Sequence, residues 1–173
     1  MILDQIINGN DLTKVFDKYF DFRIEDVSLL SDRWQLISES KVSVFGSDST
    51  GSVFGVLGEG DIELLPVVYL SSEGQAGVIA KTIKEFIELI VFLPAWRDLI
   101  YSETEAEITQ TAKEIEESMQ EILPDLPCMK IKVSGLLQLN DKLVIRNLAK
   151  VVNNAYLPKV WGDDGEEFGS LFE

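Results

Sequence analysis

The central third of the chain alternates short apolar runs with turn residues and then changes to a helical period. Four runs rich in Val and aromatic residues are bounded by Gly, Ser, Asp or Glu, which is typical of β-strands. They lie at residues 42–45, 53–57, 64–70 and 78–80. The connections between them are too short for crossover helices, so the sequence predicts an antiparallel meander.

The third run, from Leu64 to Leu70, is apolar at every position. This predicts a central strand that is covered on both faces. Pro66 has no N–H to give to the ladder, so regular pairing is expected to start only at Val67.

After residue 80 the apolar positions follow a helical period. Thr82 is a candidate N-cap, with Glu85 three residues later as its capping-box partner. The helix predicted over residues 82–93 is apolar on more than one stripe, so it should be buried from two sides. One core is predicted to contain Phe54, Val67, Tyr69, Phe86, Ile90 and Leu93.

The flanking segments predict further helices. One helix or two short ones are expected between residues 4 and 20, with Asp11 as an N-cap, and residues 34–37 are a candidate edge strand. A long helix is predicted over residues 103–123. Its narrow apolar stripe consists of Ile108, Ala112, Ile115, Met119 and Ile122.

The C-terminal part contains two prolines and one more amphipathic segment. Pro124 is expected to stop the long helix, and Pro127 to keep the chain extended after it. Asp141 is expected to cap a last helix over residues 142–156.

Together these elements predict an α+β fold: an antiparallel β-meander packed against helices, with additional C-terminal helices. A length of 173 residues favours a single domain. We assign residues 1–158 to that domain and residues 159–173 to an acidic C-terminal tail. Four apolar side chains can dock the tail on the domain: Trp161, Phe168, Leu171 and Phe172.

Part of the chain resembles the SUKH superfamily. The resemblance lies in Phe45-Gly46-Ser47-Asp48-x-x-Gly51, in Pro66-Val67-Val68-Tyr69-Leu70 with Ser72-Glu73-Gly74, and in Phe86 within the apolar helix. It covers residues 42–96, about a third of the chain. Members usually carry a Leu-Pro pair and an aromatic residue just after the N-terminal helix, and no Leu-Pro pair is found there.

The superfamily includes yeast-type cell-wall assembly regulators and many bacterial immunity proteins. The latter bind and neutralise a cognate toxin, often a nuclease, of a polymorphic or contact-dependent secretion system. The resemblance therefore implies a SUKH-like α+β domain and a non-enzymatic, protein-binding immunity function.

The charge balance restricts the kind of partner. Fifteen Lys and Arg against thirty Asp and Glu residues give a net charge of −15. This argues against nucleic acid or an anionic membrane as a direct partner and favours a basic protein, such as a cognate toxin. An acidic inhibitor would mimic the substrate of a nuclease and associate fast. The alternative is that the excess acid serves only solubility.

Two acidic sets are candidates for the partner surface. Loops on a rigid sheet can vary to suit different toxins, so the loop set is preferred; it consists of Asp48, Glu59, Asp61, Glu63 and Glu73. The other set lies on the long helix, where a narrow apolar stripe leaves most side chains in water; it consists of Glu105, Glu114, Glu116, Glu117 and Glu121. Charge reversal at Asp61 and Glu63 is expected to weaken binding more than reversal at Glu116 and Glu117.

No catalytic constellation stands out. The chain has no histidine, which removes Ser-His-Asp and Cys-His arrangements, most zinc sites and the usual general base. Residues 46–51 lack the Gly-Lys-Ser/Thr ending of a phosphate loop and are predicted to form a hairpin turn. The acids Asp48, Glu59, Asp61 and Glu63 match no calcium loop.

We therefore expect a non-enzymatic protein without cofactor or metal. The alternatives are a metal-dependent hydrolase that uses surface carboxylates and a regulatory scaffold protein with no toxin partner. Cys128 is the only cysteine, which excludes an intrachain disulfide and favours a reducing compartment. The N-terminus lacks signal-peptide features, and the longest uncharged apolar run, residues 89–96, is too short for a bilayer. The expected location is the cytoplasm.

Overall fold

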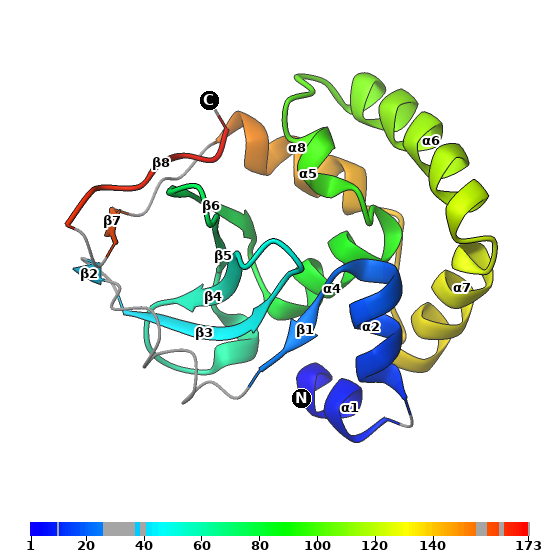
Figure 1. Cartoon of the computed structure of the whole chain (residues 1–173), viewed down its shortest axis with the longest axis horizontal. Helices are drawn as coiled ribbons and strands as arrows, with labels where there is room; N and C mark the ends of the chain where they lie inside the picture. The colour runs from blue at the N-terminus through cyan, green and yellow to red at the C-terminus, as the bar shows by residue number, and fades with distance from the viewer. Residues whose placement is uncertain (10, 26–36, 39–40, 155–158, 163–164, 173) are drawn as a thin grey trace.

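The computed structural model describes residues 1–9, 11–25, 37–38, 41–154, 159–162 and 165–172 (Figure 1). Its elements, in chain order, are α1 (Ile2–Asn8), α2 (Leu12–Phe20), β1 (Arg23–Ile24), β2 (Ile37–Ser38), β3 (Val42–Ser47), β4 (Val53–Leu57), the 3₁₀-helix η1 (Ile62–Leu64), β5 (Val67–Leu70), β6 (Gln75–Ala80), α4 (Ile83–Phe92), α5 (Trp96–Leu99), α6 (Glu105–Ile122), α7 (Leu126–Leu137), α8 (Val144–Asn153), β7 (Val160–Trp161) and β8 (Gly169–Ser170). The predicted α+β class, with additional C-terminal helices, is confirmed.

Within the described ranges, six strands form one sheet in the order β1-β3-β4-β5-β6-β8. Every neighbouring pair is antiparallel except β6 and β8, which run parallel. The meander predicted between residues 42 and 80 is therefore confirmed. The two remaining strands, β2 and β7, pair with each other. Ile37 begins β2, whereas the other residues of the predicted edge strand lie outside the described ranges.

Strand β5 lies between β4 and β6, and all four of its side chains are buried. Val67 and Tyr69 belong to the main core, while Val68 and Leu70 belong to a second apolar cluster. Because successive side chains of a strand point to opposite faces, β5 is covered on both faces, as predicted. The first residue of the predicted run, Leu64, instead lies in η1 and is 70% exposed. Pairing starts at Val67, since the chain before it forms η1.

Helix α4 packs against the sheet on one side and the outer helices α7 and α8 on the other (Figure 1). Its buried side chains take up more than one face, which confirms burial from two sides. Thr82 is the N-cap, and its hydroxyl accepts the Glu85 N–H at 3.2 Å. The Glu85 carboxylate bonds the N–H of Lys81 instead of that of Thr82, so the capping box is displaced by one residue.

Aromatic side chains form the centre of the main core. Phe86 has no exposed surface, and its ring centroid lies 5.2 Å from that of Phe22, 5.6 Å from Phe45 and 4.9 Å from Phe54. Such pairs add stability beyond the area that they bury. All six predicted core residues lie in this one cluster, so the core prediction is confirmed.

Two expected N-caps differ from prediction. The N-terminal segment forms two short helices, and Asp11 does precede the second, but its carboxylate accepts the Lys14 ammonium at 2.7 Å and caps no N–H. The last helix begins at Val144 and not after Asp141, because residues 141–143 form a turn in which the Val144 N–H bonds the Asp141 carbonyl. Helix α6 begins with a complete capping box between Thr104 and Glu107, which the sequence analysis had not identified.

The expectation of an extended chain at Pro127 is wrong. Pro127 lies in the first turn of α7, where backbone N–H groups have no acceptor within the helix and proline is tolerated. Pro124 does follow the end of α6. Ile122, the last member of the predicted apolar stripe, is 81% exposed at that end.

The tail packs on the sheet. Phe168 and Val160 are buried in the second cluster, on the face that the helices leave open, and Leu171 is buried in the main core. No helix in the described part of the chain is long and apolar enough to cross a membrane.

Truncation of Phe86 tests the core. Phe86→Ala removes a side chain in contact with three other rings, and should lower the free energy of unfolding by about 3–5 kcal/mol. The measurement is a urea melt of each variant. Ile131→Ala is the control, because Ile131 is 74% exposed on α7 and its truncation should change stability little. Equal losses in the two variants would contradict this core.

Candidate functional site

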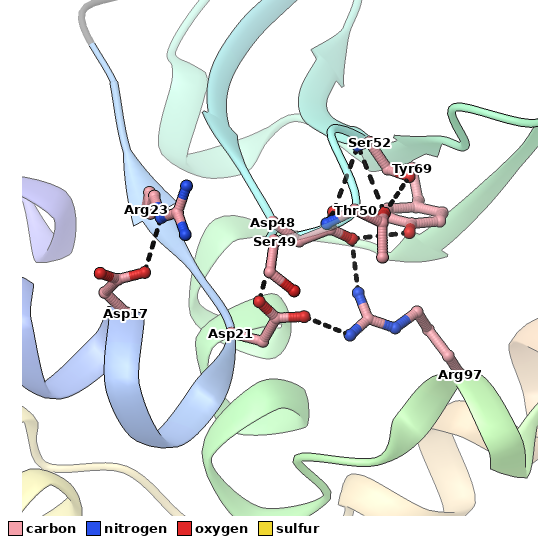
Figure 2. A network of polar contacts seen from close by, with 9 residues as sticks. All are labelled: Asp17, Asp21, Arg23, Asp48, Ser49, Thr50, Ser52, Tyr69 and Arg97. Atoms are coloured by element: carbon pink, nitrogen blue, oxygen red, sulfur yellow. Dashed lines mark hydrogen bonds and ion pairs between the residues drawn. The ribbon is translucent and has the colours of Figure 1, made fainter.

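A network of polar contacts joins the sheet to the helices, and Asp48 lies at its centre (Figure 2). Asp48 follows β3 directly, and its side chain has no exposed surface. A buried carboxylate is costly unless hydrogen bonds and a countercharge surround it. Asp48 has both hydrogen-bond donors and a countercharge around it.

One carboxylate oxygen of Asp48 organises its own turn. Oδ1 accepts the Thr50 N–H at 2.9 Å, the Thr50 hydroxyl at 2.6 Å and the Ser52 N–H at 3.2 Å. The Ser52 hydroxyl in turn accepts the N–H of Ser72, at 3.0 Å, from the turn between β5 and β6. The two turns at this end of the sheet are therefore linked.

The other oxygen, Oδ2, reaches out of the turn. It accepts the Tyr69 hydroxyl at 2.7 Å and the Arg97 Nη1 at 2.5 Å. Arg97 also donates through Nη2 to Asp21 Oδ2 at 2.5 Å. Figure 2 shows the guanidinium between the two carboxylates, where it joins α5 to the end of α2 and to the sheet.

Asp21 is held in place from two sides. It ends α2 in the left-handed conformation, with a φ of 48°, and its Oδ1 accepts the Ser49 N–H at 2.9 Å. Burial opposes ionisation of Asp21, but the hydrogen bonds from Arg97 and Ser49 outweigh it and lower the pKa of Asp21. The low pKa keeps this carboxylate charged beside Arg97.

The pKa values of the two other ionisable partners rise. Burial tends to lower the pKa of Arg97, yet the hydrogen bond to Asp21 and the neighbouring Tyr69 raise it overall. Burial is the main reason that the pKa of Tyr69 is raised, and its bond to Asp48 adds to the effect. Tyr69 therefore stays neutral and acts as a donor, and Arg97 stays charged.

The glycines near this network allow the chain to come close. A side chain at Gly46 would collide with Phe22 and would lie 2.7 Å from the Arg23 carbonyl oxygen. Gly51 closes the turn with a φ of 84°, which favours glycine. The residues that carry the SUKH resemblance in this hairpin thus serve packing and turn geometry. The hairpin turn predicted over residues 46–51 is present but occupies residues 48–52, because Gly46 and Ser47 still pair with β4.

The network offers little chemistry of its own. Both oxygens of Asp48 are already occupied by donors, so the carboxylate has no lone pair directed at a ligand. Among the described residues, no three Asp, Glu or Cys side chains converge as metal ligands would. The network therefore acts as a cross-link between the sheet and the helices α2 and α5.

The structure does not bring the five loop acids together. Neighbouring strands of a meander run in opposite directions, so Asp48 and Glu73 lie at one end of the sheet and Glu59, Asp61 and Glu63 at the other. Asp48 is buried and fully bonded, which corrects its assignment to an exposed binding surface.

Three of the other loop acids have roles or neighbours in the fold. Asp61 accepts the Glu63 N–H at 3.1 Å and begins η1, and the half-buried Glu63 accepts the N–H of Ile2. Glu59 is exposed and lies 3.8 Å from Lys41. Glu73 is exposed in its turn.

The acids of α6 are placed differently. Glu105, Glu114, Glu117 and Glu121 are exposed along one helix. Glu116 is the exception, because it lies 2.8 Å from the ammonium of Lys130, which also donates to the Phe92 carbonyl. Three exposed basic residues lie near the C-terminal helix: Arg146 and Lys150 are on α8, and Lys142 is in the turn that precedes it.

Sequence reasoning missed Asp21 and Arg97. The signal was a charged residue inside an apolar stretch: Arg97 follows Trp96 within a mostly apolar run, and Asp21 stands between two phenylalanines. A charge buried in such a setting requires a partner of opposite charge. Which partner it takes depends on the fold.

Removal of Arg97 tests the cross-link. Arg97→Met leaves Asp48 buried without its cation and should cost about 3–5 kcal/mol of unfolding free energy. The double variant Arg97→Met/Asp48→Asn should lose less unfolding free energy than the two single variants lose together, by about 1–3 kcal/mol. Urea melts measure both. Lys14→Met, at an exposed ion pair, is the control and should leave stability nearly unchanged. Strict additivity at Arg97 and Asp48 would contradict the coupling.

The lowered pKa of Asp21 predicts a pH dependence. A carboxylate whose folded pKa lies below its unfolded value of about 3.9 stabilises the fold above that pH, and loses this effect as the pH falls through the folded pKa. The stability difference between wild type and Asp21→Asn should be constant from about pH 7 to 5 and narrow below about pH 4. When Arg97→Met is present in both proteins, the stability difference caused by Asp21→Asn should change much less with pH. A difference that grows on acidification would contradict the assignment.

The chain matches no protein-family model, no curated protein and no solved structure with which it was compared. A function for it therefore rests on its own charges, contacts and burial.

Proposed function

We propose that the chain is a non-enzymatic binding protein of the immunity type, which binds a basic cognate toxin, a nuclease, and neutralises it. The observation that carries the proposal is the contrast between interior and surface charge. The buried carboxylate, Asp48, is fully compensated by Arg97 and other donors. The acids of α6 are mostly left in water, and the fold makes little use of them.

The charge on and around α6 is concentrated. Residues 98–125 contain nine acids and one base, and α6 lies at the periphery of the molecule (Figure 1). Lys113, the single base, lies 4.0 Å from Glu117 and cannot neutralise the rest. A surface of this sign attracts a basic partner and speeds its association.

The outer face of α6 replaces the sheet loops as the proposed contact surface. The loop acids are divided between the two ends of the sheet, and one of them is buried. On α6, by contrast, the exposed carboxylates of Glu114, Glu117 and Glu121 recur at i, i+3 and i+7 on one face of a rigid helix. A nuclease must hold phosphates in a basic site, so such a row can occupy that site in place of the nucleic acid.

The test compares two matched double variants. Glu117→Lys/Glu121→Lys alters exposed acids on α6, and Glu59→Lys/Glu73→Lys makes the same charge change at exposed loop acids. Asp61, Glu63 and Glu116 are left intact because the fold uses them. The ligand is the purified product of the gene immediately upstream of this chain's gene, which the proposal predicts to be a basic nuclease. Stopped-flow association and nuclease inhibition are measured at about 20 and about 200 mM salt.

The α6 variant should slow association at low salt at least about tenfold, with a smaller effect at high salt, and the loop variant should do much less. Because both variants carry the same net charge, a difference between their association rates reports where the altered acids lie. A larger effect from the loop variant would show that the contact surface is misassigned. Wild-type protein that neither binds nor inhibits the nuclease would contradict the function itself.

A further inference from the structure

A cavity of about 740 Å³, wide open to solvent, lies where α1, α2, η1, α4 and α7 come together. It is lined by none of the residues of the Asp48 network and none of the acids of α6. Its volume is within the range of about 300–1,000 Å³ that is typical of small-molecule sites. Figure 1 shows α1, α2 and α7 at the same end of the molecule.

Part of the cavity wall is apolar. Leu12 and Leu137 are buried at its base, and Met1 and Leu136 are each 58% exposed beside it. Large apolar side chains that are exposed around one concave site mark a binding surface more often than isolated ones do. The wall can therefore cover the apolar body of a ligand.

Two cations line the same cavity. Lys84 comes from α4 and Lys132 from α7, in a chain that has thirty acids and fifteen bases. Lys84 has only a loose ion pair, 4.0 Å from Glu88. Lys132 forms no ion pair within 4.0 Å among the described residues, although Asp11 is near enough to attract it. Glu63 is the acid of the lining, and its carboxylate accepts the N–H of Ile2.

We propose that this cavity binds a small organic anion with an apolar body. The anionic group lies between Lys84 and Lys132, and the aliphatic part lies against Leu12 and Leu136. Ammonium groups with incomplete ion pairs gain most from a charge-assisted bond to a carboxylate. This site and the acidic face of α6 serve ligands of opposite charge, so neither proposal depends on the other.

The test uses three probes and calorimetric titration of the full chain. Decanoate combines an anionic head with an aliphatic tail, decyltrimethylammonium has the same tail and the opposite charge, and acetate has the head alone. The variant Lys84→Gln/Lys132→Gln removes both cations, and Arg146→Gln/Lys150→Gln makes the same charge change on α8. Thermal melts check that both variants remain folded.

Decanoate should bind wild type more tightly than about 1 mM, whereas the two other probes should not. The Lys84→Gln/Lys132→Gln variant should weaken decanoate binding at least about tenfold, and the α8 variant should leave it unchanged. Decanoate should also shift the NMR methyl signals of Leu12 and Leu136. The proposal is overturned by no decanoate binding, by equal binding of the cationic amphiphile, by unchanged affinity without the two lysines, or by shifts confined to other methyl groups.

Discussion

A buried carboxylate must be surrounded by donors and a countercharge, and Asp48 imposes this requirement on three separate parts of the chain. Its own turn supplies backbone and hydroxyl donors, β5 supplies Tyr69, and α5 supplies Arg97. Arg97 then holds Asp21 at the end of α2. One set of contacts thus fixes the distance between the sheet and two helices, where apolar packing alone would allow several arrangements.

This arrangement separates two uses of acidic residues. Asp21 and Asp48 are positioned by partners and hold the fold together. On α6 the carboxylates of Glu117 and Glu121 stay in water on a helix that contacts its neighbours through a narrow stripe around Ile108 and Ala112. A rigid scaffold with surplus charge on one outer helix suits recognition by charge, because the scaffold does not have to rearrange when a partner arrives.

The strands and α4 could be predicted because their signals are local: apolar runs of fixed period between turn residues, and a threonine cap before α4. Helix α7 could not, since Pro127 resembles a stop signal and Ile131 and Leu136 are apolar but exposed, so no single stripe is seen. Outside its own turn, the partners of Asp48 are 21 and 49 residues away in the chain. That Glu59 and Glu73 lie at opposite ends of the sheet follows from the predicted antiparallel meander, but the choice of the loop acids as one surface did not take strand direction into account.

The parallel pairing of β8 with β6 has a consequence for the order of folding. The meander from β3 to β6 is built from neighbours in the chain and can pair once residue 80 has left the ribosomal exit tunnel. Its β6 edge, however, is covered by residues near 170, which arrive after all of α4 to α8. An uncovered strand edge is a template for pairing with other chains. During translation this edge is therefore the part of the nascent chain most in need of protection, by the ribosome surface or by a chaperone.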